Sequence, residues 1–160
     1  MPAERGCSVI TIRVAGVPAP QGSKRHVGGG RMVESSRAVG PWREAVRAET
    51  QRVMGPARAR FGDEYVSRFA YCLRDPVQVT VKFTLPRPQG HYGTGSRATT
   101  VRPSAPRWPH RKPDLDKLIR AVLDGITQGG AIADDAQVVR IAAQKTYGTP
   151  GAVITIEELT

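Results

Sequence analysis

The sequence has few cysteines, no long hydrophobic run and no recognisable signal peptide, and each absence excludes a class of protein. Its two cysteines, Cys7 and Cys72, lie far apart and form no CxxC motif, so we expect ordinary thiols in a reducing compartment. No apolar stretch approaches the roughly 18–20 residues that cross a bilayer. The N-terminus lacks the apolar segment of a secretory signal. These absences predict a cytoplasmic protein without a membrane partner.

The composition indicates a globular protein that binds an anionic partner. The chain has 160 residues, of which 39% are hydrophobic. A domain of this length hides roughly 70% of the surface of its unfolded chain, so residues 1–160 are expected to form a single domain without disulfides. Lys and Arg number 24 against 14 Asp and Glu, a formal net charge of +10. This excess favours nucleic acid as the partner.

The charge is distributed unevenly along the chain. Residues 76–113 carry seven Lys and Arg and no carboxylate, whereas residues 114–160 carry four Lys and Arg and seven carboxylates. A basic segment therefore runs directly into an acidic cluster. A protein that only binds a polyanion gains nothing from this cluster, which repels phosphate unless metal ions neutralise it.

Alternating apolar residues predict four strands, within residues 8–17, 77–83, 139–143 and 152–156. A helix is expected from Pro41, with Pro56 as its end. The clearest helix follows Pro113, where apolar residues recur at helical spacing between Leu115 and Ile126 and Gly129 closes the pattern. Four strands and at least two helices indicate an α/β (α+β) fold.

Three segments lack such a regular pattern. Residues 21–31 are expected to form a flexible basic loop. Residues 57–75 are ambiguous, although the spacing of Phe61, Tyr65 and Phe69 indicates a short helix. Residues 86–113, with six prolines and three glycines, predict a long basic loop, and loops of this length inside a domain are usually functional or disordered.

The acidic cluster carries the strongest indication of chemistry. Asp114 and Asp116 stand at the start of the second helix, and Asp134 and Asp135 come just before the next strand. We expect the helix, loop and strand to return Asp134 or Asp135 to the start of the helix. Three converging carboxylates would suit Mg²⁺ or Mn²⁺, ions that hold a scissile phosphate and activate water.

Each of these carboxylates also has a purely structural interpretation. Asp114 is a suitable helix cap, and Asp116 has the spacing to pair with Arg120. Asp134 and Asp135 are also common turn residues. Trp108 and Tyr92 either stack on bases or pack the basic loop against the body. No histidine or cysteine spacing supports zinc, and no phosphate-loop or nucleophile-elbow motif is present.

Several motifs together resemble one family. The segments are KPDLDKL from Lys112, RAVLDG from Arg120 and DDAQVV from Asp134, with GVPAPQGSKR from Gly16 as a weaker match. Their combination is similar to the RusA family of Holliday-junction resolvases, most strongly over residues 112–156.

The resemblance implies a small homodimer with a mixed α/β fold, encoded by a bacterium or phage, that cuts four-way DNA junctions in recombination and repair. It implies Mg²⁺ as cofactor, with Mn²⁺ as the alternative, and no organic cofactor. The catalytic and metal-binding aspartates of the family fall on Asp114, Asp116 and Asp135. A catalytic cation falls on Arg120, where lysine is usual, and Lys117 stands where asparagine is common.

The expected DNA contacts come from the basic turn near the N-terminus and from the long basic loop: Lys24, Arg25, Arg97, Arg102, Arg107, Arg111 and Lys112. Two alternatives to a nuclease remain at this point. The chain could be a basic nucleic-acid-binding protein without catalysis, or a structural oligomer whose acidic cluster forms intersubunit salt bridges.

Overall fold

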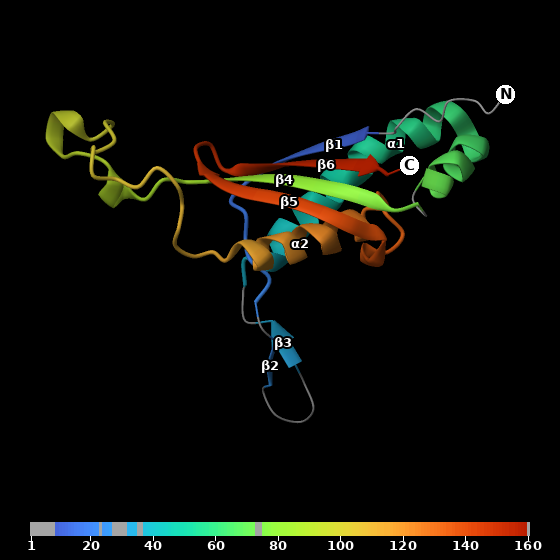
Figure 1. Cartoon of the computed structure of the whole chain (residues 1–160), viewed down its shortest axis with the longest axis horizontal. Helices are drawn as coiled ribbons and strands as arrows, with labels where there is room; N and C mark the ends of the chain where they lie inside the picture. Colours follow the sequence, from blue (N-terminus) through green and yellow to red (C-terminus); the bar gives the residue numbers. More distant parts are fainter. Residues whose placement is uncertain (1–8, 23, 27–31, 35–36, 73–74, 160) are drawn as a thin grey trace.

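The protein is built around a mixed sheet whose four strands lie in the order β1-β6-β4-β5 (Figure 1). The structure, a computed structural model, describes residues 9–22, 24–26, 32–34, 37–72 and 75–159; for 24–26, 32–34 and 56–72 it describes the secondary structure alone. The elements are β1 (Val9–Ala15), β2 (Lys24–His26), β3 (Met32–Glu34), α1 (Val39–Cys72), β4 (Val77–Leu85), the 3-10 turns η1 (Gln89–His91) and η2 (Gly95–Arg97), α2 (Leu115–Gln128), η3 (Asp135–Gln137), β5 (Val138–Tyr147) and β6 (Gly151–Glu158). The predicted α/β (α+β) class is confirmed.

The pairing of the strands makes the sheet mixed. Strand β6 is antiparallel to both β1 and β4, while β5 runs parallel to β4. In β4 the residues at alternate positions, such as Val79, Val81 and Phe83, are fully buried, and Thr80 and Lys82 between them are exposed. Because alternate side chains point to opposite faces, one face of the sheet is the core and the other carries polar residues.

Both helices pack on the buried face of the sheet. Helix α1 contributes Trp42 and Val46 to the core, and α2 contributes Leu118, Val122 and Ile126. All five side chains are at most 3% exposed. The helical spacing that predicts α2 from the sequence therefore describes its buried side correctly.

Helix α1 extends well beyond its predicted end. The expectation that Pro56 stops the helix is wrong, because α1 continues to Cys72. Proline inside a helix destabilises it by about 3 kcal/mol, which favours a helix end at that point but does not require one. The segment of Phe61, Tyr65 and Phe69 lies in the second half of α1, as their spacing indicated. Among the described residues no helix is long and apolar enough to cross a bilayer.

The segment predicted as a flexible basic loop contains a small hairpin. Strand β2 pairs antiparallel with β3, with Lys24 opposite Glu34, and the hairpin projects from the body (Figure 1). The expectation of a loop is therefore wrong at these strands. They are held by the hydrogen bonds of strand pairing, and three-residue strands are too short to show an alternating pattern in the sequence. Gly28–Gly30 lies outside the described residues.

Residues 86–113, which we call the arm, project from the end of the sheet (Figure 1). This segment is a long loop with internal order: it contains η1 and η2, and Tyr92 forms an isolated antiparallel bridge with Val101. The amide of Gly93 donates to the carbonyl of Thr100 at 2.9 Å. Trp108 is 52% exposed, and the guanidinium of Arg107 lies over its ring at 5.3 Å.

The close approach of α1 and α2 depends on a glycine. A Cβ added at Gly125 would lie 2.6 Å from Cγ1 of Val46, whereas one added at Gly55 of α1 meets no atom of the described side chains within 4 Å. We expect Gly125→Ala to lower the free energy of unfolding by about 1–3 kcal/mol, because the helices must separate. Thermal and urea unfolding measure this change.

The matched control is Gly55→Ala, also in a helix interior. Alanine gains roughly 0.5–1 kcal/mol over glycine in a helix interior, but the ring of Pro56 disfavours a Cβ on the helical residue before it, so we expect a small net change in the free energy of unfolding. Equal effects of the two substitutions would contradict the packing assigned to Gly125.

Candidate active site

The start of α2 presents the first of the predicted aspartates. Asp114 occupies the N-cap position with extended backbone angles, and its carbonyl accepts from the amide of Leu118 at 3.2 Å. Its carboxylate makes no capping hydrogen bond and lies 3.1 Å from Nζ of Lys117, with 45% of the side chain exposed. The carboxylate therefore does not serve as a helix cap, and it faces solvent beside one lysine.

Asp116 and Arg120 lie one turn apart on α2, and both are exposed. No ion pair between described residues joins them or involves either one. The pairing that their spacing allows is therefore not made. The start of α2 thus carries two carboxylates and, one turn further, a guanidinium that is available to an anion.

A lysine from the sheet holds the backbone that leads into α2. Nζ of Lys145 donates to the carbonyl of Arg111 at 3.0 Å and to the carbonyl of Pro113 at 2.8 Å. Lys145 lies opposite Phe83 in the register of β4 and β5, and so on the face of the sheet that the helices cover. It therefore fixes the position of the residue just before Asp114.

The first turn of α2 also contacts the loop that follows β1. The amide of Gln21 donates to the carbonyl of Lys117 at 3.0 Å. Oε1 of Gln21 is buried without a hydrogen-bond partner among the described atoms. The segment that links β1 to the basic hairpin β2–β3 is therefore attached to the start of α2.

Sequence reasoning did not assign a role to Lys145 or Gln21. A signal for Lys145 was present, because Ile141, Ala143 and Lys145 alternate along one face of a predicted strand. A charge that continues an apolar face needs a specific partner. For Gln21 the sequence held no comparable signal, since its contact depends on how the loop folds back.

Asp135 lies at the opposite end of α2 from Asp114 and Asp116. The helix has 14 residues and so is ~21 Å long, and η3 follows a short loop after its C-terminus. Lys145, beside the start of α2, and Val138, beside Asp135, are separated by roughly 23 Å of strand β5. Figure 1 shows the two ends of α2 at opposite ends of β5.

The expectation that the chain returns Asp134 or Asp135 to the start of α2 is therefore wrong within one chain. Among the described residues no three His, Cys, Asp or Glu side chains form a group able to hold a metal ion. The reason is the parallel pairing of β5 with β4, which requires β5 to begin at the far end of the sheet.

Two further aspartates have structural partners. Oδ1 of Asp134 accepts from the amide of Ala136 at 2.8 Å, and Asp134 forms a capping box with Gln137. Oδ2 of Asp124 lies 3.3 Å from Nη1 of Arg43 and so joins α2 to α1. Asp135 itself is exposed.

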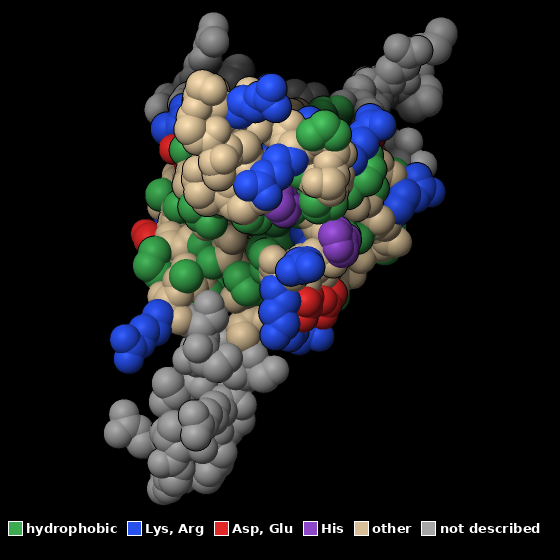
Figure 2. Space-filling model, turned by 90° about the vertical axis from the view of Figure 1, so that its left-hand side faces the viewer, with side chains coloured by type: hydrophobic (Ala, Val, Ile, Leu, Met, Phe, Trp, Pro, Cys, Tyr) green, Lys and Arg blue, Asp and Glu red, His purple; other side chains and the backbone are tan. Residues whose placement is uncertain are grey.

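Most of the predicted DNA-contacting residues lie on the arm, at one end of the sheet. Five of them are exposed along the arm: Arg97, Arg102, Arg107, Arg111 and Lys112. Lys24 and Arg25 lie in β2, and their side chains are outside the described part of the structure. Seen from the arm's end, Lys, Arg and both described histidines surround a hollow, with carboxylates beside it (Figure 2). This surface is typical of a protein that binds nucleic acid.

Carboxylates next to a basic arm are the arrangement expected of a protein that acts on the phosphodiesters of nucleic acid. The sequence profile of the family described as Endodeoxyribonuclease RusA matches residues 15–157. The chain belongs to the RusA family, whose members are endodeoxyribonucleases that resolve Holliday junctions, and it is therefore a hydrolase. A comparison with curated proteins finds no match.

The positioning role of Lys145 can be tested with variants that leave the aspartates unchanged. We expect Lys145→Met to lower the free energy of unfolding by about 1–3 kcal/mol. Methionine keeps the apolar part of the side chain but cannot donate the two hydrogen bonds to the carbonyls of Arg111 and Pro113. Cleavage should fall as well, since the start of α2 loses its anchor. Lys145→Arg retains a donor and should recover part of both losses.

Urea unfolding and single-turnover cleavage measure the two effects. A methionine variant with unchanged stability and rate would show that the two hydrogen bonds do not position α2.

Proposed function

We propose that the protein is a Mg²⁺-dependent, structure-selective endodeoxyribonuclease that resolves four-way junctions by paired cuts, acting as a homodimer in DNA recombination and repair. The observation that supports this most is the position of Asp114 and Asp116 at the start of α2, directly after the basic arm. A basic surface alone would suit a protein that binds DNA without cutting it. Two exposed carboxylates next to that surface favour a nuclease.

The residues present suit Mg²⁺ by their donor chemistry. This ion prefers oxygen ligands and is commonly held by one or two carboxylates together with water and substrate phosphate. Asp114 and Asp116 would supply the two carboxylates, and Asp135 is the third candidate. When bound, the ion supplies an activated water and neutralises charge on the scissile phosphate.

The remaining groups of the chain orient the phosphate. The N-terminal end of α2 has the positive end of the helix dipole, which favours an anion there. Arg120 lies one turn further along the same helix, without an ion-pair partner among the described residues. Its guanidinium can stabilise the negative charge that develops on the phosphate in the transition state. Lys145 holds the backbone before Asp114 in place.

A homodimer would bring Asp135 to the other aspartates. Strand β5 is the outer strand of the sheet and is paired only with β4 in the described chain. Val139 and Ile141 on this strand are 62% and 42% exposed. An unpaired edge with exposed apolar residues is a natural site for association with a second copy.

Two-fold symmetry determines which ends of the two β5 strands lie next to each other in such a dimer. If β5 pairs antiparallel with β5 of the partner, the Val138 end of one strand lies against the Tyr147 end of the other. The Val138 end directly follows η3, which contains Asp135, and the Tyr147 end lies beside the start of α2. Each metal site would then combine Asp114 and Asp116 of one protomer with the partner's Asp135. Two such sites suit the two opposing cuts in a four-armed junction.

The first test replaces the aspartates. Asp114→Asn, Asp116→Asn and Asp135→Asn should each abolish Mg²⁺-dependent cleavage of a four-way junction and leave junction binding intact, because the amide keeps the shape and removes the charge. An equimolar mixture of Asp114→Asn and Asp135→Asn should recover nicking. About half of the dimers then contain one subunit of each variant. In such a dimer one site carries both substitutions and the other carries neither, so the nicking rate should return to about a quarter of the wild-type rate.

The mixture of Asp114→Asn with Asp116→Asn is the matched control, and it should stay inactive because both changes fall on the same half of a site. Recovery in neither mixture, with exchange of subunits demonstrated, would contradict a site shared between two protomers, and an active Asp135→Asn variant would exclude Asp135 from the site. Cleavage by wild type that persists in EDTA would refute the metal dependence itself.

The second test concerns Arg120. Arg120→Ala should lower the single-turnover cleavage rate at least ~100-fold, the scale of losing one electrostatic group at a transition state. Junction affinity should remain within a few-fold, because the arm supplies most of the binding charge. Arg120→Lys should retain substantial activity if charge alone is needed. An alanine variant that cuts within three-fold of wild type would exclude Arg120 from the reaction.

A further inference from the structure

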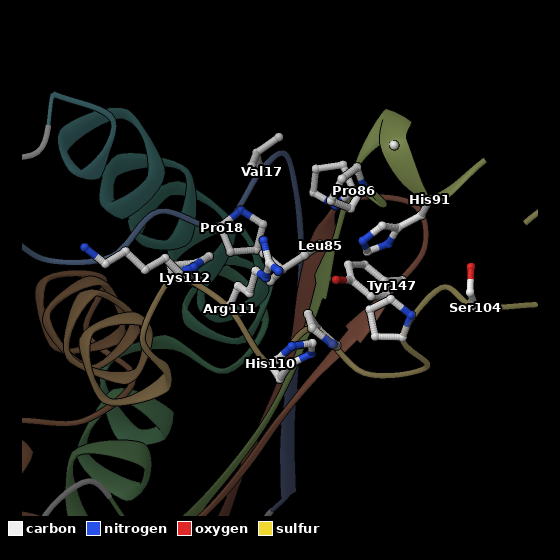
Figure 3. A pocket seen from close by; sticks show the side chains of 15 residues that line it. Val17, Pro18, Leu85, Pro86, His91, Ser104, His110, Arg111, Lys112 and Tyr147 are labelled. Carbon is white, nitrogen blue, oxygen red and sulfur yellow. The ribbon is translucent and has the colours of Figure 1, made fainter. Parts of the chain in front are cut away.

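A cavity of about 760 Å³ lies at the root of the arm, next to the candidate active site (Figure 3). Its walls come from the loop after β1, the end of β4, the arm and the end of β5. Pro113, the residue before Asp114, belongs to the lining. The volume is within the range of roughly 300–1,000 Å³ that is usual for small-ligand sites. The position makes it accessible to a group of the same DNA whose phosphate lies at Asp114.

The walls are suited to a flat ring. Six of the lining residues are prolines, and Val17, Leu85 and the ring of Tyr147 add further apolar surface. Tyr147 is held in place, since the guanidinium of Arg87 lies 4.2 Å from the centre of its ring and the rings of His91 and Tyr147 pack edge to face with their centroids 5.6 Å apart. Figure 3 shows the rings of His91 and Tyr147 side by side along one wall.

The charge of the lining is entirely of one sign. Arg111 and Lys112 are cationic, His91 and His110 add imidazole nitrogens, and the lining contains no carboxylate. Arg87 is itself anchored, because its Nη1 donates to the carbonyl of Pro106 at 3.0 Å. A ligand that combines a flat ring with a negative group matches both properties. In DNA this description fits a nucleotide whose base has left the stack.

We propose that this cavity receives one unpaired nucleotide of the branched DNA, with its base against the prolines, Tyr147 and His91 and its phosphate toward Arg111. The proposal rests on the proposed function and adds how the enzyme distinguishes a branch from linear duplex. Removing a base from a stack costs least where pairing is already interrupted. A branch point therefore supplies the ligand, and a continuous duplex does not.

The test compares binding of two junctions in EDTA, so that no cleavage is needed. One is an intact four-way junction, and the other has abasic sites at the nucleotides next to the branch. Wild type should bind the abasic junction ~10-fold more weakly, the scale of losing one stacked base. Binding of linear duplex, with and without abasic sites at matching positions, should be equal.

Two variants fill the cavity. Gly90 lines it, and a Cβ there meets no described atom within 4 Å, so we expect the ring of Gly90→Phe to occupy part of the cavity. Ser104 lines the cavity from another part of the arm, and Ser104→Trp is the second variant expected to fill it. Each should bind the intact junction as weakly as wild type binds the abasic one, with no further penalty for the abasic sites. Gln51→Phe, which adds a ring at an exposed position of α1, should behave as wild type.

Equal wild-type affinity for intact and abasic junctions would overturn the proposal, whatever the variants do. A full abasic penalty in folded Gly90→Phe and Ser104→Trp would overturn it as well, because the base would then bind elsewhere. Failure of the proposed function is distinguishable, since it would appear as an absence of Mg²⁺-dependent cleavage by wild type.

Discussion

Strand β5 runs parallel to β4, so the chain that leaves β4 at Leu85 must travel back along the sheet before β5 can begin. The arm and α2 together make this return. Helix α2 covers the distance while burying Leu118, Val122 and Ile126 against the sheet. The positions of the aspartates follow from this one connection, because it determines which groups lie at which end of the sheet.

The connection places the charged groups at two separate ends. At one end the arm meets the start of α2, and Lys145 holds their junction through two carbonyl oxygens. At the other end η3 leads into β5 with Asp135 exposed. In a single chain Asp114 and Asp116 therefore lie at one end of the sheet and Asp135 at the other. Symmetric association along the open edge of β5 is the arrangement that the proposed function uses to bring them together.

The same connection gives the arm its orientation. Because the arm leaves the sheet at Leu85 and returns at Pro113, its root lies beside the ends of β4 and β5, and its basic side chains lead outward from there. The cation of Arg87 over Tyr147 fastens the root to β5. Binding charge, the cavity and the aspartates at the start of α2 are thereby held together. A substrate phosphate at Asp114 would have the basic arm on one side and the cavity within reach.

The sequence determined the elements that depend on neighbours along the chain. Alternation in β1 and β4 and the apolar spacing of α2 are local patterns, and they predicted these elements correctly. The motifs that begin at Lys112, Arg120 and Asp134 were together sufficient to indicate the family. These features depend on periods of two and 3.6 residues, which a sequence displays directly.

Only the tertiary structure decided the rest. Pro56 has the local preference of a helix end, yet α1 continues through it. Asp135 follows the motif closely in sequence, yet the length of α2 and the parallel pairing of β5 place it at the far end of the sheet. Lys145 and the cavity lining acquire their roles from segments far apart in the chain. The physical reason is that strand pairing sets these distances, and pairing is a contact between residues that no local pattern connects.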